Sequence, residues 1–366
     1  MVIGGITGPI FGNLSDNTKT KYGRRTPWIL ISLPFVALGF WLLCIPYPIR
    51  FFINNAMSVT VYTIILYIIY SIVFNAMNVP YVGLMPEITG AEERTQMSFY
   101  YNMIGTIGTV SIFFVPSLLL GIYNSYAFVT GVYALILVGL MLIGLFYVKE
   151  HKNVDVQEFQ KEKMSLKDVF KNKEFIKFEI AQVCWNFAFM IILSSIISFA
   201  TTLLGLQDES ELMPFMLFLI LTVGPSVAFW LTQSDKIGKK KSLVFALIWM
   251  GSIFPFTILL GFLHFNGIPL VIPFFILIGF IAFGLPVILL MPYSILMDLT
   301  EEGKEASYMG SNSIFLNFSG SLGTLLLSIL SVIFFNQEIT IFFIIGPVLG
   351  AFLFLAAFIA HKIKIK

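Results

Sequence analysis

Long intervals without a single charged side chain restrict what this sequence can fold into. The charge-free intervals cover residues 26–49, 51–86, 95–148, 180–207, 212–234, 242–297, 306–337 and 339–361. A helix needs about 20 apolar residues to cross the hydrocarbon core of a bilayer. The intervals 95–148 and 242–297 are long enough for two crossings each, with breaks near Tyr123–Ser125 and His264–Gly267. The sequence therefore predicts ten full membrane spans.

The composition excludes a water-soluble globule. Charged residues make up 11% of the chain and hydrophobic residues 58%, whereas a soluble domain has about 25% charged residues. The net charge of +2 gives no indication of a nucleic-acid partner, and none is expected. Cys44 and Cys184 lie in apolar intervals and are expected to be buried free thiols. The three histidines have no Cys or carboxylate at ligand spacing, so we expect no metal site and no resident cofactor.

The basic residues predict how the chain is oriented in the membrane. Alternating the loops between the two sides places 21 of the 22 Lys and Arg residues on one side and leaves Arg50 on the other. Loops rich in Lys and Arg face the cytoplasm. We therefore predict a multi-pass protein of the cell membrane with cytoplasmic loops at 15–26, 149–177 and 233–241. The apolar start, 1–14, would rise only about 21 Å as a helix, which is short of the hydrocarbon core, so we expect a truncated first span.

The two halves of the chain resemble each other. Asp16 is followed by Gly23–Arg25, and Pro80–Tyr81 begins 57 residues after Gly23. The second half repeats this order with Asp235, Gly238–Lys241 and Pro292–Tyr293. Acidic turns follow both Pro-Tyr pairs, at 87–93 and 298–305, and their symmetry favours a structural role over a catalytic one. Parallel repeats of this kind enclose the central site of many transporters.

The repeat divides the chain into three parts. We expect an N-terminal helical bundle at 1–148, a cytoplasmic linker at 149–177 and a C-terminal helical bundle at 178–366. Within the linker, Ser165–Asp168 is a helix start with an acidic residue at its third helical position. It predicts a short surface helix.

The turn Asp16–Arg25 resembles the signature loop of the major facilitator superfamily. Its long form, continued by Pro27–Trp28, resembles the glycoside–pentoside–hexuronide:cation symporters and the related sucrose carriers. The segments Asn78–Thr89 and Ser165–Phe175 resemble the same branch. The resemblance implies an all-α, polytopic major facilitator fold of two six-helix bundles. Aligned with that family, the chain lacks the first helix and holds about 11 spans.

The same resemblance implies a function. It implies a secondary active transporter, not an enzyme, which moves a sugar or glycoside by alternating access as a monomer in the lipid bilayer, with Na⁺ or H⁺ as the coupling cation. Sodium/melibiose-type members carry Asp residues where this chain has Gly4, Gly8 and Asn78. The membrane interior of this chain is therefore almost uncharged. Glu179 is the carboxylate that comes closest to it, and we expect a structural role for this residue. The alternative is an uncoupled or differently coupled carrier of another organic or amphipathic solute.

The basic turns are candidates for a gate. A carboxylate can cap or charge-pair with a helix end, and Arg can hold one through forked hydrogen bonds. Such a latch would form when the cytoplasmic side closes; the alternative is that these charges only set the topology. Gly4, Gly8 and Gly12, at four-residue steps, predict a small-residue face for close helix contact. The gating candidates are Asp16, Arg24, Arg25, Asp235, Lys239 and Lys240.

Neutral polar and aromatic residues within the spans are candidates for binding a sugar, which needs hydrogen-bonding groups and an aromatic ring. Gln182, Trp185 and Asn186 lie at i, i+3 and i+4, so one helix face carries all three. Hydrogen bonding between helices explains each of these residues equally well. Besides Tyr70 and Asn75, the substrate-binding candidates are Asn78, Tyr101, Asn102, Gln182, Trp185, Asn186, Asn312 and Asn317.

Overall fold

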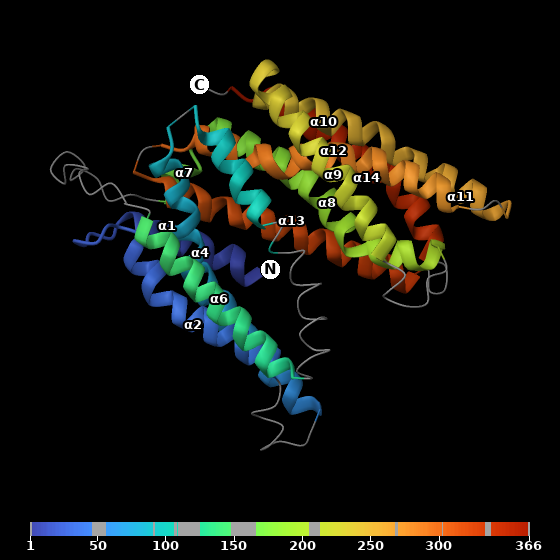
Figure 1. Cartoon of the computed structure of the whole chain (residues 1–366). Coiled ribbons are helices and arrows are strands. Elements are labelled where there is room, and N and C mark those ends of the chain that lie inside the picture. The colour runs from blue at the N-terminus through green and yellow to red at the C-terminus, as the bar shows by residue number, and fades with distance from the viewer. Residues whose placement is uncertain are drawn as a thin grey trace. The chain divides into compact units, whose positions relative to one another are not determined.

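The computed structural model gives a chain of helices (Figure 1). It describes residues 2–45, 56–90, 92–105, 108, 125–147, 166–204, 213–267, 270–301, 303–333 and 338–364, and every regular element in these ranges is helical. By its contacts the chain forms two compact units. One contains residues 2–171 and 300–314, and the other contains residues 172–299 and 315–366.

The first unit is built from the N-terminal helices. They are α1 (Val2–Asp16), α2 (Thr26–Cys44), α4 (Ala56–Ile88), α6 (Tyr126–Tyr147) and the single turn α7 (Leu166–Val169). Helix α2 packs against α4 and α6, and α4 also packs against α1. The core lies between α2, which contributes Ile29, Leu33 and Val36, and α4, which contributes Met77 and Leu84.

The second unit is built from the later helices. They are α8 (Lys173–Leu204), α9 (Met213–Ile237), α10 (Lys239–Ile253), the 3₁₀ turn η3 (Phe254–Phe256), α11 (Thr257–Phe265), α12 (Val271–Leu299) and α14 (Glu338–His361). Helix α10 packs against α12 and α14, α14 also packs against α8, and α12 also packs against α8 and α9. Helix α13 (Glu305–Ile333) contributes its first turns to the first unit and the rest to the second.

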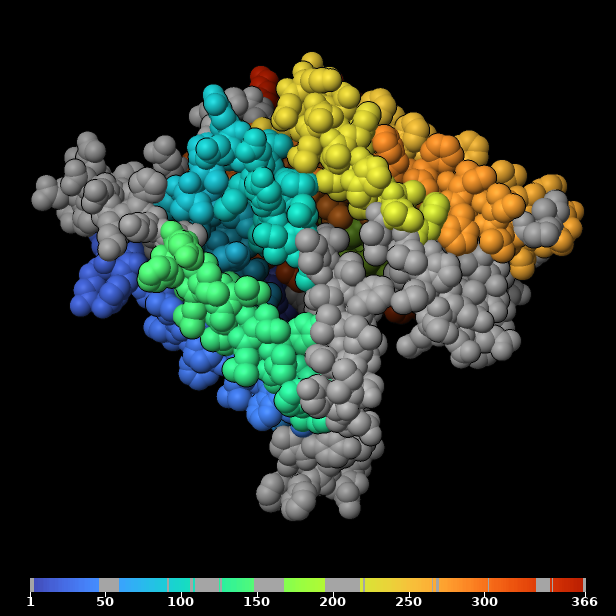
Figure 2. All heavy atoms as spheres, viewed as in Figure 1, coloured from blue at the N-terminus to red at the C-terminus, as the bar shows by residue number. Residues whose placement is uncertain are grey.

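The surface is apolar, as expected for helices in a bilayer. Figure 2 shows α6 on the outside of its unit, and its side chains Leu135 and Phe146 are 73% and 81% exposed. Polar side chains lie inside instead, and Asn75 of α4 is 8% exposed. By length and composition, seven of the described helical stretches can cross a membrane. Hydrocarbon, not water, is the medium that suits such a surface.

Most predicted spans coincide with helices. The predicted breaks are confirmed, because α6 begins at Tyr126 and the chain between α11 and α12 includes Gly267 with a φ of 69°. The predicted span at about 95–123 lies largely outside the described residues. The predicted short helix is present as the single turn α7, whose last residue, Val169, is buried. Residues 149–165 of the predicted linker lie outside the described residues. Cys44 and Cys184 are both free thiols, as predicted, but only Cys184 is buried and Cys44 is partly exposed.

Candidate functional site

The signature loop joins α1 to α2 and is held by its own hydrogen bonds. Gly23 has a φ of 110°, in the region that side-chain-bearing residues rarely adopt. Thr20 Oγ1 donates to the Gly23 carbonyl at 2.6 Å, and Trp28 Nε1 donates to Thr18 Oγ1 at 2.8 Å. These contacts fix the point at which Arg24 and Arg25 leave the loop, directly before α2.

Asp16, at the end of α1, caps the N-terminus of α13. Its Oδ2 accepts hydrogen bonds from the backbone N–H and the hydroxyl of Ser307, both at 2.7 Å, and its Oδ1 accepts from the Ala306 N–H at 3.3 Å. The first N–H groups of a helix have no partner within the helix and carry the positive end of its dipole. The α1 carboxylate thus caps a helix whose Ala306 lies 290 residues further along the chain.

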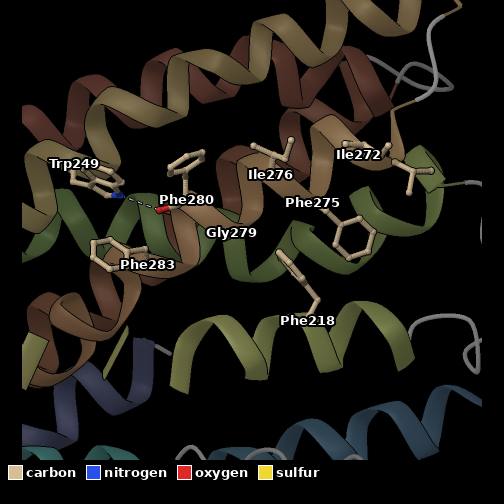
Figure 3. A pocket seen from close by; sticks show the side chains of 9 residues that line it. Phe218, Trp249, Ile272, Phe275, Ile276, Gly279, Phe280 and Phe283 are labelled. Atoms are coloured by element: carbon tan, nitrogen blue, oxygen red, sulfur yellow. Dashed lines mark hydrogen bonds between the residues drawn. The ribbon is translucent and has the colours of Figure 1, made fainter. Parts of the chain in front are cut away.

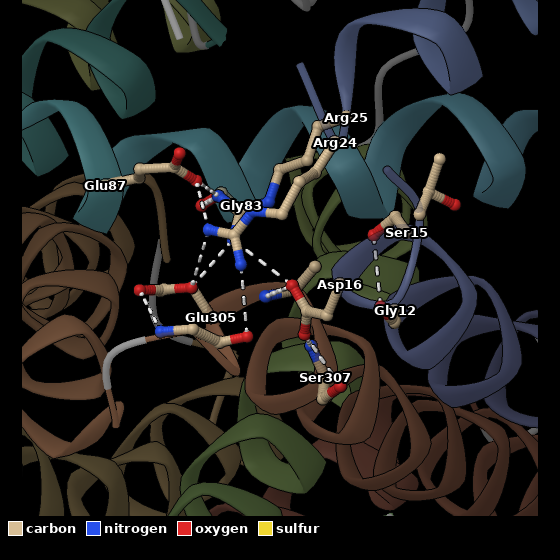
Figure 4. A network of polar contacts seen from close by, with 12 residues as sticks. Gly12, Ser15, Asp16, Arg24, Arg25, Gly83, Glu87, Glu305 and Ser307 are labelled. Carbon is tan, nitrogen blue, oxygen red and sulfur yellow. Dashed lines mark hydrogen bonds and ion pairs between the residues drawn. The ribbon is translucent and has the colours of Figure 1, made fainter. Parts of the chain in front are cut away.

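Arg25 lies at the centre of the same cluster and is fully buried (Figure 4). Its Nη2 contacts Asp16 Oδ1 at 3.2 Å and Glu305 Oε2 at 2.8 Å. Its Nη1 contacts Glu87 Oε2 at 2.6 Å and also donates to the Gly83 carbonyl. One guanidinium group therefore connects the ends of α1, α4 and α13, a task that suits its fixed fork of donors.

Arg24 adds a second, more exposed cation. Its Nη2 lies 3.2 Å from Glu87 Oε2, and its Nη1 donates to the Gly303 carbonyl at 3.4 Å. Gly303, with a φ of 83°, donates its N–H to Glu305 Oε1 at 2.8 Å. We refer to Asp16, Arg24, Arg25, Glu87, Glu305 and Ser307 together as the Asp16–Arg25 network.

Burial sets the electrostatics of this network. It raises the pKa of the Asp16 carboxyl, which lies at the helix end and outside the candidate spans, while Arg25 and the two Ser307 bonds act in the opposite direction. The neighbouring Glu305 carboxylate raises the pKa further. Asp16 is therefore protonated at a higher pH than an exposed aspartate, and protonation removes its charge pair with Arg25.

Glycines bring α1 and α13 into backbone contact beside the network. A Cβ atom on Gly12 would overlap the Ala306 carbonyl, and one on Gly8 would lie 2.9 Å from the Gly310 carbonyl oxygen. Gly310 in turn packs against the Gly8 backbone. Ser313 Oγ lies 3.4 Å from the Gly4 carbonyl oxygen. The predicted small-residue face is confirmed, and the surface that it packs against is the first half of α13.

The second repeat has the same local geometry and a smaller network. Gly238, with a φ of 87°, matches Gly23. Lys239 Nζ contacts Asp298 Oδ2 at 2.5 Å and Ser294 Oγ at 3.1 Å. Lys240 donates to the Ile363 carbonyl at 2.7 Å. Asp235 is exposed, and its carboxylate has no hydrogen bond or ion pair with any residue that the structure describes. Three of the six gating candidates, Asp16, Arg24 and Arg25, are thus brought together.

The substrate-binding candidates divide equally between the two units. Asn78, Tyr101, Asn102 and Asn312 belong to the first, and Gln182, Trp185, Asn186 and Asn317 belong to the second. Asn102 donates its amide to the Ser98 carbonyl of its own helix at 2.8 Å. Asn312 is 3% exposed, and Asn78 is half-buried. Glu179 is fully buried on α8.

Gln182, Trp185 and Asn186 all lie within helix α8, as their spacing requires, and two of them make contacts of helix packing. Trp185 is 2% exposed and packs edge-on against Phe178, with ring centroids 5.7 Å apart. Asn186 Nδ2 donates to the Leu316 carbonyl at 3.1 Å and to Ser319 Oγ at 2.6 Å, so it joins α8 to α13. These bonds favour hydrogen bonding between helices as the role of Asn186.

A double-mutant cycle tests this role. We expect Asn186→Ala and Ser319→Ala each to lower the free energy of unfolding by about 0.5–1.5 kcal/mol, the range for hydrogen bonds between membrane helices. The double variant should lose less than the sum, because both changes remove the same bond. Denaturant titration in detergent measures all three values. Strict additivity, or an Asn186→Ala variant as stable as the parent, would contradict the packing role.

Sequence reasoning missed Glu87, Glu305 and Ser307 as partners of the signature loop. The repeat carried part of the signal, because Glu87 follows Pro80 by seven residues and Asp298 follows Pro292 by six. Each of these carboxylates pairs with a basic residue that comes just after the positive-φ glycine of its own repeat. For Ser307 no local signal exists, since its N–H and its hydroxyl reach Asp16 only because α13 packs beside the end of α1.

The helices, their apolar surface and the signature loop define a polytopic membrane protein. Its fold is the major facilitator fold: it resembles the structure of the major facilitator superfamily proton:xylose symporter XylE with a TM-score of 0.69, at 14% identity, over 98% of this chain and 84% of that one. The chain also matches the MFS/sugar transport protein family over residues 1–337. It therefore belongs to that family, as the signature loop predicted.

Curated relatives align over different shares of the chain. The sodium-dependent lysophosphatidylcholine symporter 1 of Xenopus tropicalis is 22% identical over 360 residues, which is 86% of this chain and 65% of that protein. The isoprimeverose transporter of Lactiplantibacillus pentosus is 28% identical over 113 residues, which is 30% of this chain and 22% of that protein. The chain thus spans less than two thirds of the length of these relatives.

Proposed function

We propose that the chain is a secondary active transporter working by alternating access, and that the Asp16–Arg25 network is a latch that holds one access state. The observation that carries this proposal is the capping of α13 by Asp16, with Arg25 buried between three carboxylates. A contact between helix ends so far apart in sequence can break without unfolding either helix. Only such separable contacts can serve a two-state motion.

The latch belongs on the cytoplasmic side in the topology that we propose. The loops 15–26, 149–177 and 233–241 face the cytoplasm in that topology, which the distribution of Lys and Arg supports. A formed latch then corresponds to a carrier closed towards the cytoplasm. Breaking it opens the cytoplasmic side.

We propose a sugar or glycoside as the solute. The family match and the sugar carriers among the relatives support this choice. The neutral amides of the membrane interior suit a polyol, because they offer hydrogen bonds without the cost of burying charge. Coupling to Na⁺ or H⁺ is part of the proposal, and the sodium-dependent symporter among the relatives supports it.

An amphipathic solute is the second candidate. The observation that favours it is the alignment of lysophosphatidylcholine symporters over 86% of this chain, compared with 30% for the isoprimeverose transporter. Proteoliposomes containing the purified chain distinguish the two. The assay measures counterflow of labelled neutral sugars with and without a sodium or proton gradient, and we expect the sugars to be exchanged. Uptake of a fluorescent lysophospholipid without any sugar counterflow would favour the second candidate, and uptake of neither would contradict transport.

The latch itself can be tested with Asp16→Asn. The change removes the charge from hydrogen bonds worth about 1.5–3 kcal/mol each, so the cytoplasmic side should open roughly tenfold more often. The readout is labelling of a Ser15→Cys variant, free of the two native cysteines, by a membrane-impermeant maleimide. Ser15 is fully buried beside the latch.

Asp235→Asn is the matched control. It changes the same residue type at the corresponding position of the second repeat, where the aspartate is exposed. Its labelling rate should stay within about twofold of the parent, since exposed charges contribute little. Equal effects of the two changes would contradict the latch.

A further inference from the structure

The second unit carries an open apolar groove that the transport proposal does not use. It lies between α9, α10 and the first half of α12, and has a volume of about 780 Å³ (Figure 3). Its walls are aromatic and aliphatic, with Phe218 of α9 and Trp249 of α10 facing residues of α12. The α12 side is formed by Val271, Ile272, Phe275, Ile276, Gly279, Phe280 and Phe283.

The groove offers no free polar group to a ligand. The indole N–H of Trp249 donates to the Phe280 carbonyl at 3.0 Å. Trp230 Nε1 and Ser226 Oγ, which do not line the groove, donate to the Phe283 carbonyl at 2.7 and 2.6 Å. A sugar in this groove would lose its hydrogen bonds to water and gain none, which costs several kcal/mol. The ligand must therefore be a hydrocarbon group.

Gly279 keeps the space between α12 and Phe218 open. A Cβ atom at this position would lie 3.2 Å from Phe218 Cζ, closer than ordinary van der Waals contact. Phe218 also packs edge-on against Phe275, with ring centroids 4.9 Å apart. The rims stay open, since Ile272, Ile276 and Phe280 are 73%, 55% and 50% exposed. The shape is thus a slot that is open along one side.

Position and size identify what fills the slot. It extends along α12 from Val271 to Phe283, a rise of about 18 Å, while half of the hydrocarbon core is about 15 Å. Val271 is also the first residue of the candidate span Val271–Leu299, so the slot occupies the first half of that span. A helix of about 10 Å diameter over this length would need roughly 1,400 Å³, which exceeds the slot. A single hydrocarbon chain fits it.

We propose that this groove is a binding site for one acyl chain of a bilayer phospholipid, from the outer leaflet in the proposed topology. The surrounding bilayer supplies the acyl chain, because the open side of the groove faces the lipid. Recognition is by shape and by contact with aromatic rings, so the headgroup stays outside. The site does not depend on which solute the protein carries.

Brominated lipid tests the site, because bromine on an acyl chain quenches tryptophan fluorescence on contact. The protein in detergent is titrated with phosphatidylcholine brominated at mid-chain. We expect a saturable component of about one fifth of the emission, since the chain has five tryptophans, with a midpoint at least tenfold below the lipid level that quenches the remainder. The Trp249→Phe variant should lose this component.

Trp41→Phe is the matched control. The Trp41 indole also donates to a backbone carbonyl of a neighbouring helix, that of Ala127 at 3.0 Å, and Trp41 is 37% exposed. This variant should keep the saturable component. Loss of the component from both variants, or from neither, would overturn the site, because ordinary contact with surrounding lipid treats both indoles alike.

Two further variants separate occupancy of the groove from damage to the fold. Gly279→Leu fills the slot, and Ile276→Asn places an amide in it; each should raise the quenching midpoint tenfold or more. Leu140→Asn, at a 65% exposed position on α6 outside the groove, should leave it unchanged. Unchanged midpoints in both groove variants would overturn the proposal. Displacement of the brominated lipid by a transported solute would overturn the lipid as the ligand.

Discussion

Replacing Arg25 by alanine is expected to remove roughly 3–5 kcal/mol from the free energy of unfolding, the cost of breaking a buried ion pair by deleting one partner. The guanidinium group is fully buried and contacts Asp16, Glu87 and Glu305 within 3.2 Å. Without it, these three carboxylates face one another in a site with little water. Denaturant titration in detergent, followed by circular dichroism, measures the loss.

Two related variants give this prediction its controls. Arg24→Ala removes a cation that is 23% exposed and lies 3.2 Å from Glu87, so it should cost less than about 1 kcal/mol. Arg25→Lys should recover only part of the stability, because a single ammonium group cannot reproduce the planar fork that reaches three helix ends. If Arg24→Ala costs as much as Arg25→Ala, or if lysine restores full stability, the central role of Arg25 is wrong.

The helices could be predicted from the sequence because each of them is specified locally. A charge-free interval predicts a membrane span, and a glycine before a basic pair predicts a turn, without information from any other part of the chain. Gly23 and Gly238, predicted as equivalent, both have positive φ values, of 110° and 87°. The four-residue spacing of Gly4, Gly8 and Gly12 likewise predicted a contact face.

The partners of these features could not be predicted in the same way. Nothing in residues 2–16 indicates that Ala306 and Ser307 would meet them, because that contact depends on how distant helices pack. The sequence also treats Asp16 and Asp235 as equivalent, whereas the first is 4% exposed and the second is exposed. A carboxylate becomes a cap only where a helix N-terminus packs beside it.

Residue type also failed to separate binding from packing. Asn186 was predicted equally well as a sugar ligand or as a link between helices, since an amide makes the same hydrogen bonds in both cases. The bonds to Leu316 and Ser319 are visible only once α8 and α13 are placed side by side. The signature loop and the glycine face are therefore two features that can be predicted from local sequence, although the residues that they contact are determined by the packing of distant helices.

The glycine face gives the second large prediction. Gly12→Leu should destabilise the protein by about 3 kcal/mol or more, because overpacking costs about 1–3 kcal/mol and the lost helix cap adds about 1 kcal/mol. A side chain at Gly12 cannot avoid the Ala306 backbone, so α13 must move away from α1. Asp16 then loses its hydrogen bonds to Ala306 and Ser307. The same denaturant titration measures the stability, and maleimide labelling of Ser15→Cys measures how far the latch opens.

Gly139→Leu on α6 is the matched control, because a Cβ atom there meets no other atom within 4 Å. Glycine is a poor helix former by about 1 kcal/mol, so this variant should be as stable as the parent or slightly more stable, with unchanged labelling. The same Gly→Leu substitution is thus expected to lower the free energy of unfolding at Gly12 and to leave it unchanged or raise it slightly at Gly139. A Gly12→Leu protein that unfolds like the parent would show that α1 and α13 are not in backbone contact. A destabilised protein with unchanged labelling would instead separate the glycine contact from the latch, and would limit the latch to its charges.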